Sequence, residues 1–254
     1  MGIYLNPDNT DFNNMVNYSK IYVDKTKLLE YTNSVMFGAQ KYICVSRPRR
    51  FGKSMAANML TAYYSRGCDS GELFQNLKIA KADSFEKHLN KYNVIHINMQ
   101  NFLSRTQSID QMIALITKAV CRDIFREYPD IDYLDKSILS CVLDDVFEEC
   151  KIPFVIIIDE WDCIFRVHKN DTESQKKYLD FLRNLMKDQS YVSLAYMTGI
   201  LPIKKYGEHS ALNMFTEISM TDARPTQEFT GFTEEEVRSL CNKYNMPFEE
   251  TKRW

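Results

Sequence analysis

The sequence predicts an α/β fold of three layers, in which a mostly parallel sheet lies between two layers of helices. Residues 41–46 and 155–158 are apolar runs, typical of strands that are buried on both faces. Between such runs, apolar residues recur at the spacing of amphipathic helices, as in residues 108–128. Strands that alternate with helices along a chain indicate a parallel sheet that is covered on both faces.

The expected elements follow in order along the chain. Residues 21–23 are a strand-like run, and Asp24 is a candidate N-cap for a helix that continues through Tyr31. Further strands are expected at residues 41–46, 93–99, 155–158, 191–198 and 221–229. Further helices are expected at residues 55–64, 108–128, 136–150 and 174–187. Thr233 and Glu236 have the spacing of a capping box, which predicts one more helix.

This order suggests three parts. Residues 1–38 are a lead-in, residues 39–230 hold the sheet with its helices, and residues 231–254 are the start of a helical lid. A chain of 254 residues is long enough for one large α/β domain or two small ones.

The loop Arg-Pro-Arg-Arg-Phe-Gly-Lys-Ser at residues 47–54 lies between an expected strand and an expected helix. A loop in this position that ends in Gly-Lys-Ser is typical of a phosphate-binding P-loop, whose backbone N–H groups and helix dipole cradle a nucleotide. Lys53 is expected to reach the β- and γ-phosphates, and Ser54 to bind Mg²⁺. The expected nucleotide-binding residues are Arg49, Arg50, Phe51, Gly52, Lys53, Ser54 and Met55.

The loop departs from the usual pattern at its first position, where Arg47 replaces a glycine. Pro48 fixes its own φ and restricts Arg47 to extended geometry. We interpret the rigid backbone at Pro48 as a way to reach the loop conformation that a flexible glycine at the first position would otherwise allow.

Two acidic residues, Asp159 and Glu160, follow the apolar run at residues 155–158. Ligands of open parallel sheets bind at the carboxyl ends of the strands, where this pair is expected to lie. Asp159 has the position of a Walker B aspartate that holds Mg²⁺, and Glu160 that of a general base for water. The alternative for this segment alone is a core strand that ends in a solvated acidic turn.

Thr198 ends the expected strand at residues 191–198 and is the third catalytic candidate, with Glu160 and Lys53. In one interpretation its hydroxyl hydrogen-bonds the γ-phosphate or the attacking water. In the alternative, Thr198 has no catalytic role and the strand ends in a Thr-Gly turn. Arg49 and Arg50 are expected to neutralise phosphate or to pair with Asp162.

Composition excludes several classes of function. The formal charge of −2 provides no general basic field, so direct nucleic-acid binding is not expected. Apolar runs fall short of the roughly 20 residues that cross a membrane. The seven cysteines are never spaced Cys-x-x-Cys, which favours reduced thiols in a cytoplasmic protein over a zinc site.

Five segments together resemble the bacterial AAA-ATPase-like family of P-loop NTPases. They are YVDKT at 22–26, RPRRFGKS at 47–54, IDEWD at 158–162, TGI at 198–200 and GFTEEEV at 231–237. The missing first glycine is a trait of that family, whereas Trp161 stands where the family more often has tyrosine. The resemblance implies ATP with Mg²⁺ as ligand. Tyr22, Asp24 and Lys25 are candidates to close over the adenine side, although a helix start explains Asp24 equally well.

Members of that family commonly continue into a C-terminal domain that resembles PD-(D/E)XK nucleases. The resemblance therefore implies that residues 1–254 are a fragment or a member without that effector domain, and that a protein partner or the missing domain receives the signal. The oligomeric state stays open.

The motifs predict Mg²⁺-dependent ATP hydrolysis, with Glu160 orienting water and Lys53 offsetting charge on the phosphates. The alternative is a nucleotide-gated switch with little intrinsic hydrolysis. A small-molecule kinase is less consistent with the sequence, because the Asp159–Glu160 pair favours water as acceptor.

Overall fold

The computed structural model describes residues 2–203, 212–220 and 228–253. Its centre is a five-stranded sheet in the order β2-β3-β4-β1-β5, with every neighbouring pair parallel. The strands are β1 (Tyr42–Ser46), β2 (Asn93–Asn98), β3 (Phe154–Asp159), β4 (Val192–Gly199) and β5 (Thr216–Ile218). Because all strands run the same way, their carboxyl ends meet at one edge.

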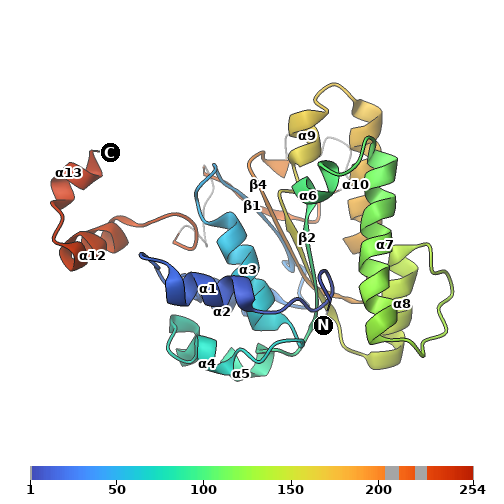
Figure 1. The fold of residues 1–254 in the computed structure, drawn as a ribbon, viewed down its shortest axis with the longest axis horizontal. Coiled ribbons are helices and arrows are strands. Elements are labelled where there is room, and N and C mark those ends of the chain that lie inside the picture. The colour runs from blue at the N-terminus through green and yellow to red at the C-terminus, as the bar shows by residue number, and fades with distance from the viewer. Residues whose placement is uncertain (1, 204–211, 221–227, 254) are drawn as a thin grey trace.

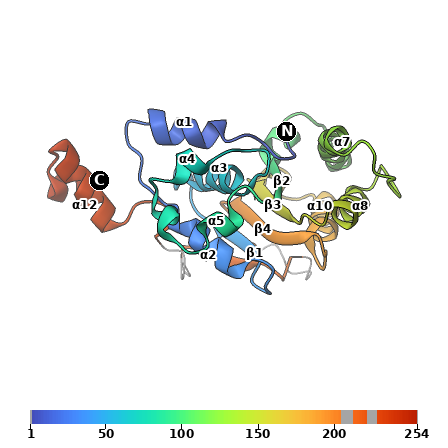
Figure 2. The same ribbon diagram turned by 90° about the horizontal axis from the view of Figure 1, so that it is seen from below.

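Helices cover both faces of the sheet (Figures 1 and 2). One layer holds α1 (Thr10–Tyr18), α2 (Lys27–Val35), α3 (Lys53–Tyr64), α4 (Gly71–Phe74) and α5 (Phe85–His88). The other holds α7 (Ile109–Glu127), α8 (Leu139–Cys150) and α10 (Thr172–Met186), with the short helices α6 (Met99–Leu103) and α9 (Cys163–Val167) near the carboxyl edge. The predicted three-layer α/β fold is confirmed.

The sheet separates two hydrophobic cores, and β3 contributes to both. Val155 and Ile157 pack with the α3 side, whereas Ile156 and Ile158 pack with the α7 side. A strand with apolar residues on both faces reads as a continuous apolar run, which is why its sequence predicts it well.

The N-terminal residues pack against this body. Leu5 forms an antiparallel bridge with Ile95 of β2, and Phe12 of α1 stacks on Phe74 at 5.1 Å between ring centroids. The strand expected at residues 21–23 does not form, because this extended segment has no neighbouring strand; it is fixed by side chains such as Tyr22, which packs edge-on against Phe12.

Asp24 is not the N-cap of α2. Its carboxylate accepts hydrogen bonds from the backbone N–H of Thr26 at 2.8 Å and of Lys78 at 2.7 Å. It thereby joins two loops, and α2 begins after Thr26.

The last expected strand, at residues 221–229, falls mostly on residues 221–227, which lie outside the described residues. The fifth strand that the structure contains is β5, which we did not predict. It is three residues long and only Ile218 is buried, so it carries too little apolar pattern to be recognised.

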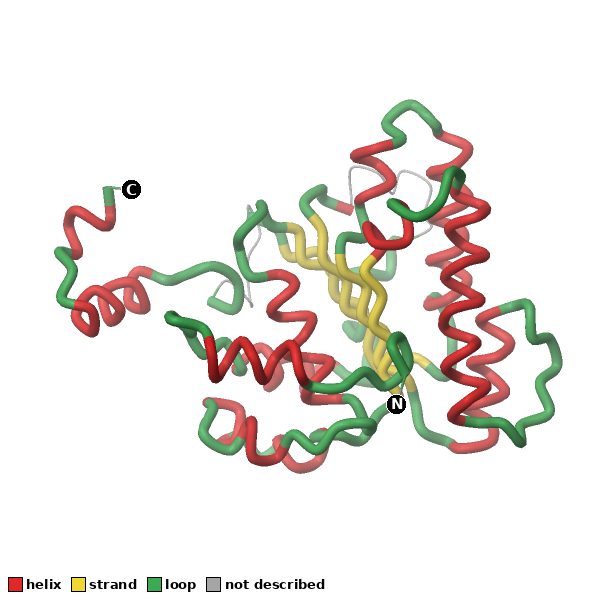
Figure 3. Tube along the Cα trace, in the orientation of Figure 1, coloured by secondary structure: helices red, strands yellow, loops and turns green. Residues whose placement is uncertain are grey.

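The capping box of α12 (Glu234–Tyr244) is confirmed, with both Thr233 and Glu236 making its reciprocal bonds. Figures 1 and 3 show α12 and α13 (Phe248–Lys252) extending away from the sheet and its two helical layers. Several contacts hold this arm to the body. Gly231 donates its N–H to the Phe51 carbonyl at 3.0 Å, Lys25 pairs with Glu236 at 2.6 Å, and the Tyr244 hydroxyl donates to the Lys20 carbonyl at 2.7 Å.

We expect Lys25→Met to loosen this arm without unfolding the body. The ammonium of Lys25 is mostly buried and also donates to the Glu228 carbonyl at 2.6 Å. Losing charge-assisted bonds of this kind costs about 1.5 kcal/mol, or roughly tenfold in a local opening equilibrium. Amide hydrogen exchange within α12 should rise by that factor, whereas Lys27→Met, at an exposed position, should leave it unchanged. Equal exchange in both variants would show that Lys25 does not hold the arm.

Candidate functional site

The loop between β1 and α3 has the backbone geometry of an anion-binding turn. Arg50 and Gly52 both adopt left-handed φ angles, of 69° and 77°. Glycine adopts this conformation at little cost, which accounts for Gly52 directly before the helix. α3 begins at Lys53, two residues earlier than expected, so Lys53 and Ser54 form its first turn beside the positive end of the helix dipole.

Lys53 lies under the loop rather than on its surface. It is buried, and its Nζ donates to the carbonyls of Arg47 at 3.0 Å and Pro48 at 2.9 Å. Burial lowers the pKa of the Lys53 ammonium, and the nearby Glu160 carboxylate partly offsets this effect. The loop therefore wraps around a fixed cation.

Arg47 does not line the loop but anchors it. Its guanidinium is buried and donates to the Thr230 hydroxyl at 3.0 Å, while its backbone N–H donates to the Gly199 carbonyl at 3.0 Å. Rigidity at this position therefore comes from tertiary bonds to β4 and to the segment before α12, in addition to Pro48.

Asp159 is the hydrogen-bonding centre of the site. One carboxylate oxygen accepts from the Ser54 hydroxyl at 2.7 Å and from the Asn98 amide at 3.2 Å. The other accepts from the Thr198 hydroxyl and from the backbone N–H of Glu160, the latter at 3.1 Å. Four donors fix the rotamer of Asp159, so its position is set before any ligand arrives.

The sheet register explains why these residues meet. Asn98 is paired with Asp159 across β2 and β3, and Met197 is paired with Ile158 across β3 and β4, so Thr198 lies beside Asp159. Thr198 is fully buried, and its hydroxyl bonds Asp159. Asn98 was missed from the sequence, although its place at the end of a predicted strand was the available signal.

The residues at this edge fit Mg²⁺. The Ser54 hydroxyl and an Asp159 carboxylate oxygen are adjacent hard oxygen donors, which Mg²⁺ prefers. No cluster of three or more His, Cys, Asp or Glu that could hold a metal occurs in residues 2–203, 212–220 and 228–253. In proteins that act on nucleotides, Mg²⁺ is usually held by one or two protein oxygens together with water and phosphate.

Glu160 is turned out of the sheet by a left-handed backbone, with φ of 57°. Its carboxylate forms an ion pair with Arg166 of α9, whose Nε lies 3.4 Å from Asp162. Left-handed backbone is uncommon outside glycine, asparagine and aspartate, and it tends to occur at functional sites. Arg166 was also missed from the sequence, because no motif marks it.

Asp162 is fully buried and does not pair with Arg49 or Arg50. Its carboxylate accepts the backbone N–H groups of Ile200 at 3.0 Å and Leu201 at 2.9 Å. It therefore ties the turn after β3 to the turn after β4, and this part of the site is structural.

The exposed residues of the loop line one pocket. Arg49 and Arg50 are exposed there, beside Lys53 and Ser54. Gln100, Glu160 and Arg166 form its other side. This arrangement places four cationic side chains around a pocket with a single carboxylate, which suits a polyphosphate.

A second, mainly apolar cleft adjoins this pocket. The P-loop contributes Phe51 and Met55, the N-terminal segment contributes Tyr22, and the segment before α12 contributes Phe229 and Phe232. Lys25 also lines it, but Asp24 does not. Gly231 approaches Phe51 so closely, with φ of 72°, that an added Cβ would lie 3.0 Å from the ring. The cleft therefore offers apolar and aromatic side chains next to the loop at residues 47–54.

All predicted nucleotide-binding residues except Phe51 line the pocket beside the loop, and Phe51 lines the cleft. Asp159 and Thr198 lie beneath the pocket. Ser54, which lines the pocket, donates a hydrogen bond to Asp159, and Asp159 accepts another from Thr198. The sequence also offers Arg224, near the last expected strand, either as a sensor or finger arginine or as an Arg-Pro in a loop with no catalytic role, and this residue lies outside the described residues.

No helix in the described part of the chain is both long enough and apolar enough to cross a membrane. All seven cysteines are free thiols.

Solved structures resemble this chain only distantly. The Orc1 protein of Aeropyrum pernix, solved in complex with DNA, shares 15% identity with a TM-score of 0.48, over 91% of this chain and 52% of that chain. A DNA replication initiation factor shares 9% identity with a TM-score of 0.37, over 92% of this chain and 55% of that chain. The chain thus spans about half the length of either protein.

The comparison with protein families is decisive. No curated protein matches the sequence significantly. The model of the AAA-ATPase-like family, described as a predicted AAA-ATPase, matches residues 9–207 and so includes the P-loop, Asp159, Glu160 and Thr198. That match covers well over half of the 254 residues, and it confirms the resemblance noted from the motifs: the chain belongs to the AAA-ATPase-like family.

Proposed function

We propose that this chain binds ATP with Mg²⁺ and hydrolyses it. The observation that carries the proposal is the contact between Ser54 and Asp159 at 2.7 Å, directly beside the buried Lys53. A hydroxyl, a carboxylate and an ammonium at one strand edge are the groups that P-loop NTPases use on the terminal phosphates.

The residues have separate roles in this proposal. Lys53 exchanges its backbone partners for the β- and γ-phosphate oxygens, and Arg49 and Arg50 neutralise further phosphate charge. Mg²⁺, held through Ser54 and Asp159, supplies charge stabilisation as a Lewis acid. Glu160 orients and deprotonates water, and Thr198 holds Asp159 in place. The base binds in the apolar cleft between Tyr22, Phe51 and Phe232.

The proposal extends to the organisation of the chain. Residues 39–230 are the NTPase core, residues 1–38 a lead-in that helps to form the base cleft, and residues 231–254 the start of a lid. The protein works in the cytoplasm, and a protein partner or a further domain receives the effect of nucleotide binding.

A second candidate, a nucleotide-gated switch with little hydrolysis, is favoured by one contact. The carboxylate of Glu160 is already engaged by Arg166. A carboxylate that is held by Arg166 is not free to bind the attacking water, so turnover is slow until this pair opens.

Phosphate release from ATP and from GTP, with Mg²⁺ and with EDTA, tests the proposal on the parent chain. Steady release from ATP that EDTA abolishes supports the ATPase. Nucleotide binding without release supports the switch. Absence of binding to either nucleotide would rule out both.

We expect Arg166→Ala to raise both kcat and KM for ATP by several fold. The substitution frees Glu160 and removes one cation from the phosphate pocket. Steady-state kinetics separate the two effects. Arg183→Ala, at a half-exposed pair on α10, is the matched control and should change neither constant. A fall in kcat would instead show that Arg166 assists the reaction.

A further inference from the structure

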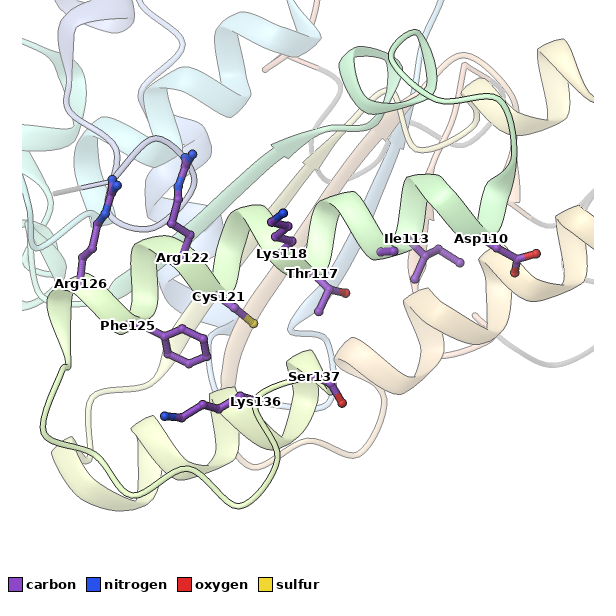
Figure 4. Close-up of a pocket in the computed structure, with 11 residues that line it drawn as sticks. Asp110, Ile113, Thr117, Lys118, Cys121, Arg122, Phe125, Arg126, Lys136 and Ser137 are labelled. Carbon is purple, nitrogen blue, oxygen red and sulfur yellow. The ribbon is translucent and has the colours of Figure 1, made fainter.

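A groove in the outer layer of helices gathers positive charge away from the nucleotide site. Four of its lining residues are cationic, namely Lys118, Arg122, Arg126 and Lys136, and one is acidic, Asp110. Figure 4 shows the three cations of α7 along one side of that helix, and Lys136 beside Phe125 on the other.

The spacing of the α7 cations makes them a row. Lys118, Arg122 and Arg126 follow one another at intervals of four residues, which places successive side chains about 6 Å apart along one helix face. Across the groove, Nζ of Lys136 lies 5.8 Å from the ring centroids of both Phe125 and Tyr133. The aromatic rings hold this ammonium at the groove.

Little negative charge balances the row. Asp110 is paired with Lys177 at 3.0 Å, and Asp123, which lies 3.5 Å from Arg122, also accepts the backbone N–H of Tyr4. Lys118 and Arg126 form no ion pair with any residue that the structure describes. Since the chain as a whole has a formal charge of −2, the positive charge here is local.

Apolar side chains also line the groove, and others are exposed in the segment that carries Lys136. Ile113 and Phe125 are partly exposed on the floor. Leu134 and Ile138, on the segment that carries Lys136, are 84% and 47% exposed. Exposed apolar side chains that gather beside cations are typical of a protein-binding surface.

We propose that this basic groove docks an acidic amphipathic segment of a partner protein. Carboxylates of that segment pair with Lys118, Arg122 and Arg126, while its apolar side chains pack on Ile113 and Phe125. The proposal does not depend on nucleotide binding.

The same observations disfavour a nucleic acid as the occupant. Phosphate backbones need an extended basic surface, whereas the basic row of this groove is three side chains long. Phe125 already packs edge-on against Tyr133 at 4.8 Å between centroids, so it is partly engaged within the protein rather than a free platform for a base.

Fluorescence anisotropy with a labelled synthetic peptide tests the proposal on the full chain. The peptide carries Glu and Leu at helical spacing. Two further probes are the same peptide with Leu replaced by Ser, and single-stranded oligothymidine. Lys118→Glu/Arg126→Glu reverses two charges of the groove, and Lys169→Glu/Lys176→Glu reverses two exposed charges elsewhere as the control.

We expect saturable binding of the Glu/Leu peptide that weakens at least about tenfold in the groove variant and less than about twofold in the control. Equal weakening in both variants, or no saturable binding to the parent chain, would overturn the proposal. If the parent chain binds the Ser-containing peptide as tightly as the Glu/Leu peptide, apolar packing on Ile113 and Phe125 does not contribute to binding, and that part of the proposal is wrong. Tighter binding of oligothymidine, lost in the groove variant, would assign the groove to nucleic acid instead.

Discussion

Glu160→Gln is expected to lower the rate of phosphate release from ATP by about 10²–10⁴-fold, the usual contribution of a positioned general base. The amide has the shape of the carboxylate but cannot accept the proton of the attacking water. Nucleotide affinity should be retained, because Lys53, Ser54 and the loop backbone stay in place. Phosphate release and the binding of a fluorescent nucleotide, measured on the same preparation, separate the two effects.

The matched control is Glu173→Gln on α10, where the side chain is 82% exposed. It should release phosphate at the parental rate. Parental turnover in Glu160→Gln would show that Glu160 is not the base, and the Glu160–Arg166 pair would then be structural. If the parent binds ATP without turnover, the two proteins will not differ in rate, and the switch is the better description.

The parts of the fold that the sequence predicted are those in which local pattern and burial agree. The sequence of β3 is recognisable as a strand because Ile156 and Ile157, which point to opposite faces of the sheet, each lie in a hydrophobic core. The loop at residues 47–54 was recognised because it ends in Gly-Lys-Ser between a strand and a helix, and Gly52 adopts a left-handed φ directly before that helix. In both cases the residues next to one another in the sequence are enough to predict the local structure.

The rest depends on tertiary contacts that leave no local trace. Arg166 reaches Glu160 only because the backbone at Glu160 turns left-handed after β3. Arg47 is buried because it bonds Thr230, 183 residues further along the chain. Asn98 was within reach, since parallel pairing of two predicted strands places it opposite Asp159, but the pairing itself was not predicted.

Lys53→Met should abolish nucleotide binding without harming the fold. In the bound state we expect Lys53 to donate charge-assisted bonds to two phosphates, each contributing about 1.5–3 kcal/mol, so their loss weakens binding at least about a hundredfold. A ligand at a hundred times its Kd stabilises the folded state by about 2.7 kcal/mol, which is about 5–10 °C in Tm for a chain of this size. MgATP should therefore raise Tm in the parent but not in the variant.

The pKa of Lys53 indicates what to expect without nucleotide. Burial lowers this pKa, so the charged form is penalised in the folded state. The penalty is fully present at pH values below the lowered pKa and disappears as pH rises past the ordinary value. Methionine removes the penalty but leaves the carbonyls of Arg47 and Pro48 without a donor, and the opposed effects should keep Tm near that of the parent. Lys176→Met, at an exposed position, should keep both Tm and its rise with MgATP. A rise in Tm with MgATP that survives in Lys53→Met would place the nucleotide outside this loop.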